Sequence, residues 1–127
     1  MEAVNKPLLL TLHNMKQLKK YCLALDLKDD RDLIAEYEAH HKNVWPSIIK
    51  SIKDAGIEVL DIYRTRNRLF MIIEATDDFS FEKKAAADKT NSKVQEWEEL
   101  MWKFQQSLPW AKPGEKWILM DKIFELP

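Results

Sequence analysis

Residues 57–75 read IEVLDIYRTRNRLFMIIEA, two apolar segments separated by a polar, arginine-rich turn. Residues 57–63 and residues 69–75 are rich in β-branched and aromatic side chains, a composition typical of strands. Residues 64–68, which surround Asn67, carry the polar side chains of a turn. The stretch therefore predicts an antiparallel hairpin, and the elements on its two sides decide which sheet the hairpin joins.

The chain before this hairpin predicts one strand followed by a broken helix. Residues 20–27 (KYCLALDL) alternate with the period of two that a half-buried strand shows. From Arg31 onward, apolar residues recur at spacings of three and four, which favours a helix capped by Asp29 or Asp30. Pro46 disfavours helical geometry at the residue before it. A second helical segment over residues 46–55 is expected to end at Gly56.

The chain after the hairpin predicts two helical segments and a last strand. Residues 79–88 and 91–106 show helical spacing, and residues 117–124 are predicted to form the strand. The order strand, helix, strand, strand, helix, strand is that of the ferredoxin-like βαββαβ fold in the α+β class. We expect a four-stranded antiparallel sheet with the helices on one face. Because the other face needs a cover, we also expect a face-to-face homodimer.

Length and charge limit the classes of partner. The chain has 127 residues, enough for a single domain, which we place at residues 20–127 behind a peripheral leader at residues 1–19. Its 20 Lys and Arg and 21 Asp and Glu give a net charge of -1, so we expect no nucleic-acid partner. The longest apolar run near the start, residues 7–10, is too short for a membrane span, so we expect no membrane partner.

The cysteine, glycine and tryptophan contents narrow the function further. Cys22 is the single cysteine and cannot form an internal disulfide, which is typical of a reducing compartment and predicts a cytoplasmic protein. Only two glycines, Gly56 and Gly114, are present, which excludes the Gly-rich loops that bind phosphates. The five tryptophans favour either a large aromatic core or a pocket for a flat apolar ligand. The sequence leaves both interpretations open.

Tyr37 and His41 form the strongest local candidate for chemistry. They lie one helical turn apart, so the phenol and the imidazole project toward the same side. Histidine titrates near neutral pH, which suits general acid–base catalysis. The alternative is a histidine pair at the surface of a helix end. A metal site is not expected, because His40 and His41 point about 100° apart on a helix and the spacing of zinc ligands is missing.

A set of spaced residues resembles the L-rhamnose mutarotase family. The matching motifs are Tyr37-x-x-x-His41-x-x-x-Trp45-Pro46, Gly56, Ile62-Tyr63, Asn67-x-Leu69-Phe70, Gln95-x-Trp97 and Phe124-x-Leu126-Pro127. The resemblance covers residues from about 20 to 127 and implies a dimeric α/β barrel that needs no cofactor. It implies interconversion of the α and β anomers of a 6-deoxyhexopyranose. It also implies that His41 is the proton donor and that Tyr37 and Trp97 bind the sugar.

The chain departs from the family pattern at the sugar-binding positions. Glu98 stands where the family has the second tryptophan of a pair. Leu60 stands where the family has a pocket tyrosine, and Tyr63 follows three residues later. We therefore expect Tyr63 and Glu98 to join the sugar contacts, with Glu98 either at the pocket rim or facing water. The proton acceptor is left open among Tyr37, Glu98, another carboxylate and water.

The predicted function is interconversion of the anomers of L-rhamnose, an isomerase reaction. Opening and reclosing the sugar ring needs one group that gives a proton and one that takes a proton. The near alternative is the same reaction on L-fucose. Two alternatives of other classes share the fold: a haem-degrading or quinol monooxygenase, and a dimeric module that binds a small ligand without catalysis.

Overall fold

A computed structural model describes residues 17–127. Its elements are, in chain order, β1 (Lys19–Leu27), α2 (Arg31–His41), α3 (Pro46–Asp54), β2 (Ile57–Thr65), β3 (Arg68–Ala75), α4 (Phe81–Lys89), α5 (Ser92–Trp102), β4 (Gln105–Gln106) and β5 (Ile118–Leu119). Residues 1–16 of the predicted leader lie outside the described residues, and β1 begins at Lys19.

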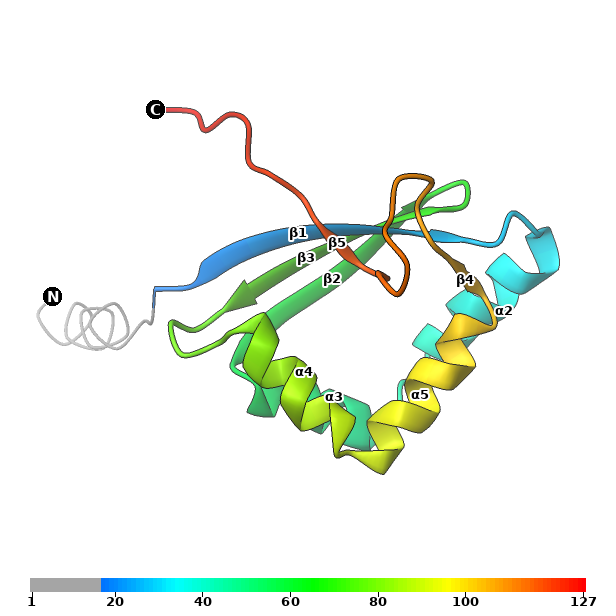
Figure 1. Cartoon of the computed structure of the whole chain (residues 1–127), viewed down its shortest axis with the longest axis horizontal. Coiled ribbons are helices and arrows are strands. Elements are labelled where there is room, and N and C mark those ends of the chain that lie inside the picture. The colour runs from blue at the N-terminus through cyan, green and yellow to red at the C-terminus, as the bar shows by residue number, and fades with distance from the viewer. Residues whose placement is uncertain (1–16) are drawn as a thin grey trace, which may run out of the picture.

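One antiparallel sheet carries all the helices of residues 17–127 on a single face (Figure 1). The strand order is β2-β3-β1-β4, and β5 also pairs with β1. The predicted hairpin is formed by β2 and β3, whose register pairs Tyr63 with Phe70 and Leu60 with Ile73. The α+β, ferredoxin-like prediction is confirmed.

The predicted four-stranded sheet is wrong in one respect, because the described sheet has five strands. The helix expected to reach Gln106 ends at Trp102, and the chain then pairs Gln105 and Gln106 with β1 as β4. The last strand, expected over residues 117–124, is confined to Ile118–Leu119. Two short strands therefore share the edge of β1, since the loop between them leaves the sheet. Within one chain the sheet does not close into a barrel.

Three of the described helices, α2, α4 and α5, follow a residue whose side chain caps them. At α2 the carboxylate of Asp30, one of the two expected caps, accepts hydrogen bonds from the backbone N–H groups of Asp32 and Leu33, both at 3.0 Å. The side chains of Ser80 and Asn91 accept in the same way at α4 and α5. Pro46 opens α3 at a position where no backbone N–H is needed. The predicted break between α2 and α3 is thus confirmed.

Two apolar clusters lie between the sheet and the helices. One gathers Tyr37, Trp97, Met101 and Phe104 with other residues near the ends of α2 and α5. The other lies at the far end of the sheet around Ile57, Ile73 and Phe79 with neighbouring residues. Ile52 and Trp117 pack against both clusters. The region where the two clusters meet is therefore bounded by the sheet on one side and by the helices on the other.

No described helix covers the opposite face of the sheet (Figure 1). That face carries half-buried apolar side chains. Register places Cys22 beside Ile72, and Ala24 beside Phe70, so these side chains share a face because directly paired residues point the same way. We call this surface the open face. Asp26 is buried on it and is held by two hydrogen bonds from the Arg68 guanidinium, at 2.8 and 3.2 Å.

Gly56 and Gly114 allow a matched test of backbone packing. Both have positive φ, at 96° and 84°, where an L side chain costs about 1–2 kcal/mol. A Cβ at Gly56 would lie 2.6 Å from Thr76 Oγ1, whereas at Gly114 it would meet nothing within 4 Å. Gly56→Ala should therefore lower the free energy of unfolding by more than Gly114→Ala does. Urea unfolding of both variants measures the difference, and equal losses would show that the approach of Thr76 does not matter.

Candidate active site

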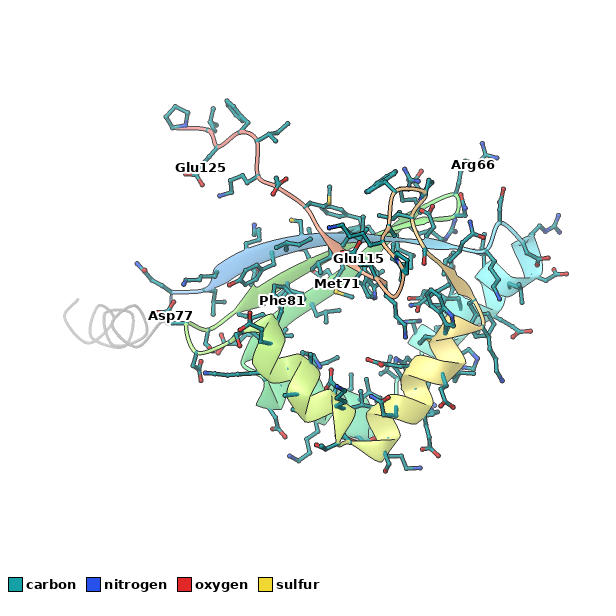
Figure 2. The ribbon with its side chains drawn as sticks, viewed as in Figure 1. Arg66, Met71, Asp77, Phe81, Glu115 and Glu125 are labelled. Carbon is teal, nitrogen blue, oxygen red and sulfur yellow. The ribbon has the colours of Figure 1, made fainter. Side chains whose placement is uncertain are left out.

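A cavity of about 700 Å³ lies where the two apolar clusters meet, bounded by the helices and the sheet. That volume is in the range of small-ligand pockets. Figure 2 shows Met71 of β3, one of its lining residues, on the side of the sheet that faces the helices. The lining also includes Tyr37, His41, Ile48, Ile52, Leu60, Trp97, Met101, Gln105 and Trp117.

His41 is the last residue of α2, and its ring is held in one orientation. Nδ1 lies 2.8 Å from the backbone oxygen of Tyr37. A carbonyl oxygen only accepts, so Nδ1 carries a proton and donates it. No described group hydrogen-bonds Nε2. Neutral His41 therefore has its lone pair on Nε2, the nitrogen that remains free for a ligand.

Burial also sets the protonation state of His41. It lowers the pKa of the imidazole below its ordinary value, an effect that the bond to the Tyr37 carbonyl opposes and the nearby His40 reinforces. The ring is consequently neutral at pH 7. In that state it is a proton acceptor, and it becomes a donor only after it has taken a proton.

Tyr37 provides a hydroxyl that keeps its proton. Its side chain is only 4% exposed, and burial raises its pKa to about 12, although a hydrogen bond from Gln105 opposes the shift. The Gln105 amide donates to the phenolic oxygen at 3.4 Å, so the O–H of Tyr37 is left to donate to a ligand. Tyr37 is thus excluded as the proton acceptor at neutral pH, which removes one of the four candidates.

Aromatic rings form one wall of the site. The Tyr37 and His41 rings lie 4.4 Å apart between centroids, and the Trp97 ring meets His41 at 5.7 Å with its plane inclined by 69°. Trp45 packs against Trp97 at 5.1 Å in a similar edge-on arrangement. Trp97 belongs to the buried core and also lines the cavity. The two interpretations of the tryptophans therefore both apply to it.

The structure brings together three of the five predicted site residues, His41, Tyr37 and Trp97. Tyr63 also touches the cavity, but it is 58% exposed and its pairing with Phe70 places its side chain on the open face. Glu98 is half-buried beside Trp97 and does not line the cavity. The helical turn of about 100° between neighbouring residues separates the two side chains.

Sequence reasoning missed several residues of the lining. Gln105 was expected in a helix, and its contact with Tyr37 depends on the β4 pairing that replaces the helix. Lys53, Glu58 and Asp61 supply charged groups at the cavity, yet each reads as an ordinary surface residue in the sequence. No local signal marks them, because the cavity forms only when α3 and β2 are packed together.

Residues 17–127 hold no cluster of three or more potential metal ligands of the His, Cys, Asp and Glu types. None of the described helices is long and apolar enough to cross a membrane. What the cavity offers is a neutral imidazole with a free Nε2, a protonated phenol, an amide and an aromatic wall. This set can move a proton between two oxygens of a bound neutral molecule.

Two solved structures share the fold at low sequence identity. An L-rhamnose mutarotase from Formosa agariphila superposes with a TM-score of 0.63 at 20% identity, over 86% of this chain and 99% of that one. A tetracenomycin F2 cyclase from Streptomyces glaucescens superposes with a TM-score of 0.55 at 15% identity, with the same coverage. At these identities the likeness supports the architecture alone.

Sequence comparison is more specific. The family model described as L-rhamnose mutarotase matches residues 20–126. An L-fucose mutarotase from Xanthomonas campestris pv. campestris is 43% identical over 111 residues, which cover 86% of this chain and 89% of that protein. A UPF0734 protein from Dictyostelium discoideum is 38% identical over 115 residues, covering 85% and 90%. The chain therefore belongs to the L-rhamnose mutarotase family, whose members are isomerases that interconvert sugar anomers.

Proposed function

We propose that the protein interconverts the α and β anomers of a 6-deoxy-L-hexose, with His41 moving the proton. The observation that carries this proposal is the hydrogen bond from His41 Nδ1 to the Tyr37 carbonyl, which leaves Nε2 as a base inside a sugar-sized cavity. The uncatalysed reaction already proceeds in water, so one well-placed group with a pKa near neutrality is sufficient to accelerate it.

The proposed reaction begins with proton removal from the anomeric hydroxyl by His41 Nε2. The freed electron pair forms the aldehyde carbonyl at C1, and the bond between C1 and the ring oxygen breaks. The ring oxygen keeps that electron pair and takes the proton back from the His41 imidazolium. Rotation about the C1–C2 bond then presents the other carbonyl face, and the reverse steps close the ring. Proton donor and acceptor are thus the same residue at different stages.

The other lining residues suit a deoxy sugar. The Tyr37 O–H can donate to the oxygen on which negative charge develops, and Gln105 holds the phenol in place. The Trp97 ring and the apolar side chains of α3 can cover the C–H surface and the methyl group of the sugar. Glu58 supplies a carboxylate acceptor for hydroxyl groups. None of these steps requires a cofactor, and we propose that the protein uses none.

Two sugars are candidates for the substrate. The sequence motifs favour L-rhamnose, and the family model carries that name. The relative from Xanthomonas campestris pv. campestris, at 43% identity, is an L-fucose mutarotase and favours L-fucose. The two sugars differ in hydroxyl orientation, so we expect the carboxylate acceptor at β2, Glu58, to take part in the choice.

We further propose that the protein is a cytoplasmic homodimer. The open face exposes apolar side chains of three neighbouring strands, a surface that soluble monomers seldom leave bare. A second copy placed face to face covers it by symmetry. The single cysteine lies on that face as a free thiol, which is compatible with a reducing compartment.

Saturation-transfer NMR on a panel of hexoses tests the activity. Catalytic amounts of protein should speed exchange between the anomeric protons of L-fucose, L-rhamnose or both, and should leave D-glucose at its spontaneous rate. Binding of a sugar without faster exchange would favour the ligand-binding module instead. Oxygen uptake with haem or a quinol, with no sugar response, would favour the monooxygenase.

Replacing each of the two adjacent histidines separates their roles. His41→Asn should lower the catalysed exchange rate at least about a hundredfold, the usual loss for a general acid–base residue. His40→Asn should keep most of the activity, because the His40 ring packs against Phe104 and not in the cavity lining. Equal losses in the two variants would contradict the assignment of His41.

The pH dependence tests whether His41 works from its neutral form. As pH falls through the lowered pKa of His41, below the ordinary value of about 6.5, the imidazolium can no longer accept the first proton. The catalysed rate should therefore decline on the acid side and stay level from about pH 7 to pH 9, since Tyr37 titrates only near 12. A rate that rises from pH 7.5 to pH 5.5 would show that the protonated ring starts the reaction.

A further inference from the structure

Gln105 is a buried amide in an apolar setting. It begins β4 and pairs with Leu27 of β1, which is 0% exposed and belongs to one of the two apolar clusters. Directly paired residues of neighbouring strands point to the same face, so the Gln105 side chain lies on the helix side of the sheet. It is 6% exposed and lines the cavity. The adjacent Gln106 pairs with Asp26, is exposed and lies on the open face.

The amide of Gln105 has a capacity for hydrogen bonds that its own chain does not use. Its Nε2 donates to the phenolic oxygen of Tyr37 at 3.4 Å, and no other group in residues 17–127 hydrogen-bonds this side chain. The carbonyl oxygen Oε1 therefore keeps two unused lone pairs. No side-chain nitrogen or oxygen that is fully buried in that part of the chain lacks a partner. Oε1 is thus not sealed in the core, and the space that Gln105 borders is the cavity.

The neighbours of Gln105 indicate which part of a bound sugar it meets. In the proposed reaction His41 acts on the anomeric hydroxyl, and the Tyr37 O–H donates to the ring oxygen, where negative charge develops as the ring opens. Both of these sugar oxygens are bonded to C1. On its other side the ring oxygen is bonded to C5, which carries the methyl group. Because the Gln105 amide adjoins the phenolic oxygen of Tyr37, the C2 hydroxyl, which is vicinal to the anomeric centre, is the sugar donor nearest to Oε1.

We propose that Oε1 of Gln105 accepts a hydrogen bond from the C2 hydroxyl of the bound sugar and thereby selects the configuration at C2. This inference rests on the proposed anomer interconversion and goes beyond it, because it assigns part of the choice of sugar to one residue. L-Rhamnose carries an axial C2 hydroxyl and L-fucose an equatorial one, and the two sugars also differ at C4. An amide held in place by Tyr37 suits one orientation of the hydroxyl, since hydrogen bonds weaken steeply away from linear geometry.

Four 6-deoxy-L-hexoses separate the effect of C2 from that of C4. L-Fucose and 6-deoxy-L-talose differ only at C2, as do 6-deoxy-L-glucose and L-rhamnose, and the two pairs differ from each other only at C4. The wild-type protein should favour the same C2 configuration in both pairs, by at least about fivefold in kcat/KM for anomer exchange, the size expected for one hydrogen bond. Equal kcat/KM values within each pair would overturn the proposal, because no choice is then made at C2.

Gln105→Met removes the acceptor while keeping the length of the side chain and its packing. It should lower all four rates by a common factor, because Tyr37 loses its hydrogen bond, and it should reduce the C2 preference to within about twofold. The ratios between C4 epimers should stay as they are in the wild type. Gln106→Met, a matched change on the open face, should alter neither ratio. A C2 preference that survives in Gln105→Met would overturn the proposal, as would a larger change in the C4 ratios than in the C2 ratios.

A sugar that lacks the C2 hydroxyl removes the same hydrogen bond from the side of the ligand. Gln105→Met should slow the exchange of 2-deoxy-L-fucose no more than it slows the disfavoured C2 epimers, because in those cases there is no bond to lose. A loss on 2-deoxy-L-fucose as large as that on the favoured epimers would show that Oε1 does not contact the C2 hydroxyl.

Binding of the same sugars, followed by NMR titration, gives a readout that does not depend on catalysis. If the wild type accelerates exchange but neither binds nor reacts with a preference at C2, the role of Gln105 fails and the proposed function stands. If the wild type binds with a C2 preference that Gln105→Met abolishes, yet accelerates no exchange, the proposed function fails and the role of Gln105 stands. A protein that neither binds nor interconverts any of these sugars would overturn both.

Discussion

The antiparallel pairing of β1 holds the fold together, because that strand lies inside the sheet and joins segments from both halves of the chain. It pairs with β3 along eight residue positions on one side and with β4 and β5 on the other. At its end, Leu27 donates to the Asn67 carbonyl and accepts from the Asn67 side chain, while Lys28 donates to Phe104. These hydrogen bonds attach the β2–β3 turn and the segment after α5 to the end of β1, just before α2 begins.

The hydrogen bonds at the end of β1 explain why the proposed chemistry lies at the ends of α2 and α5. Because α2 follows β1, it places the Tyr37 ring against Phe104 and the His41 ring against Trp97. Burial there acts on the two titrating groups in opposite directions, since it lowers the pKa of the imidazole and raises that of the phenol. Both shifts favour the neutral form. At neutral pH both groups are thus uncharged, which suits proton transfer on a neutral ligand.

The single chain leaves two requirements of a stable sheet protein unmet. Apolar side chains remain on the open face, and the backbone of β2 remains unpaired beside the cavity. Both are surfaces on which another chain can pair or pack. A face-to-face homodimer, as proposed above, would cover the open face with a second sheet.

Local patterns in the sequence determined the hairpin, the broken first helix with its caps, the order of elements and the pairing of Tyr37 with His41 on one helical face, because each depends on residues close together in the chain. Only the tertiary structure decided the pairing of β4 in place of the end of a predicted helix, the shortening of the last strand to β5, and the contact of Gln105 with Tyr37. It also decided that Tyr63 points to the open face and that Glu98 stays outside the cavity lining. These features depend on strand register and on packing between segments far apart in sequence, and neither leaves a periodic signal within a segment.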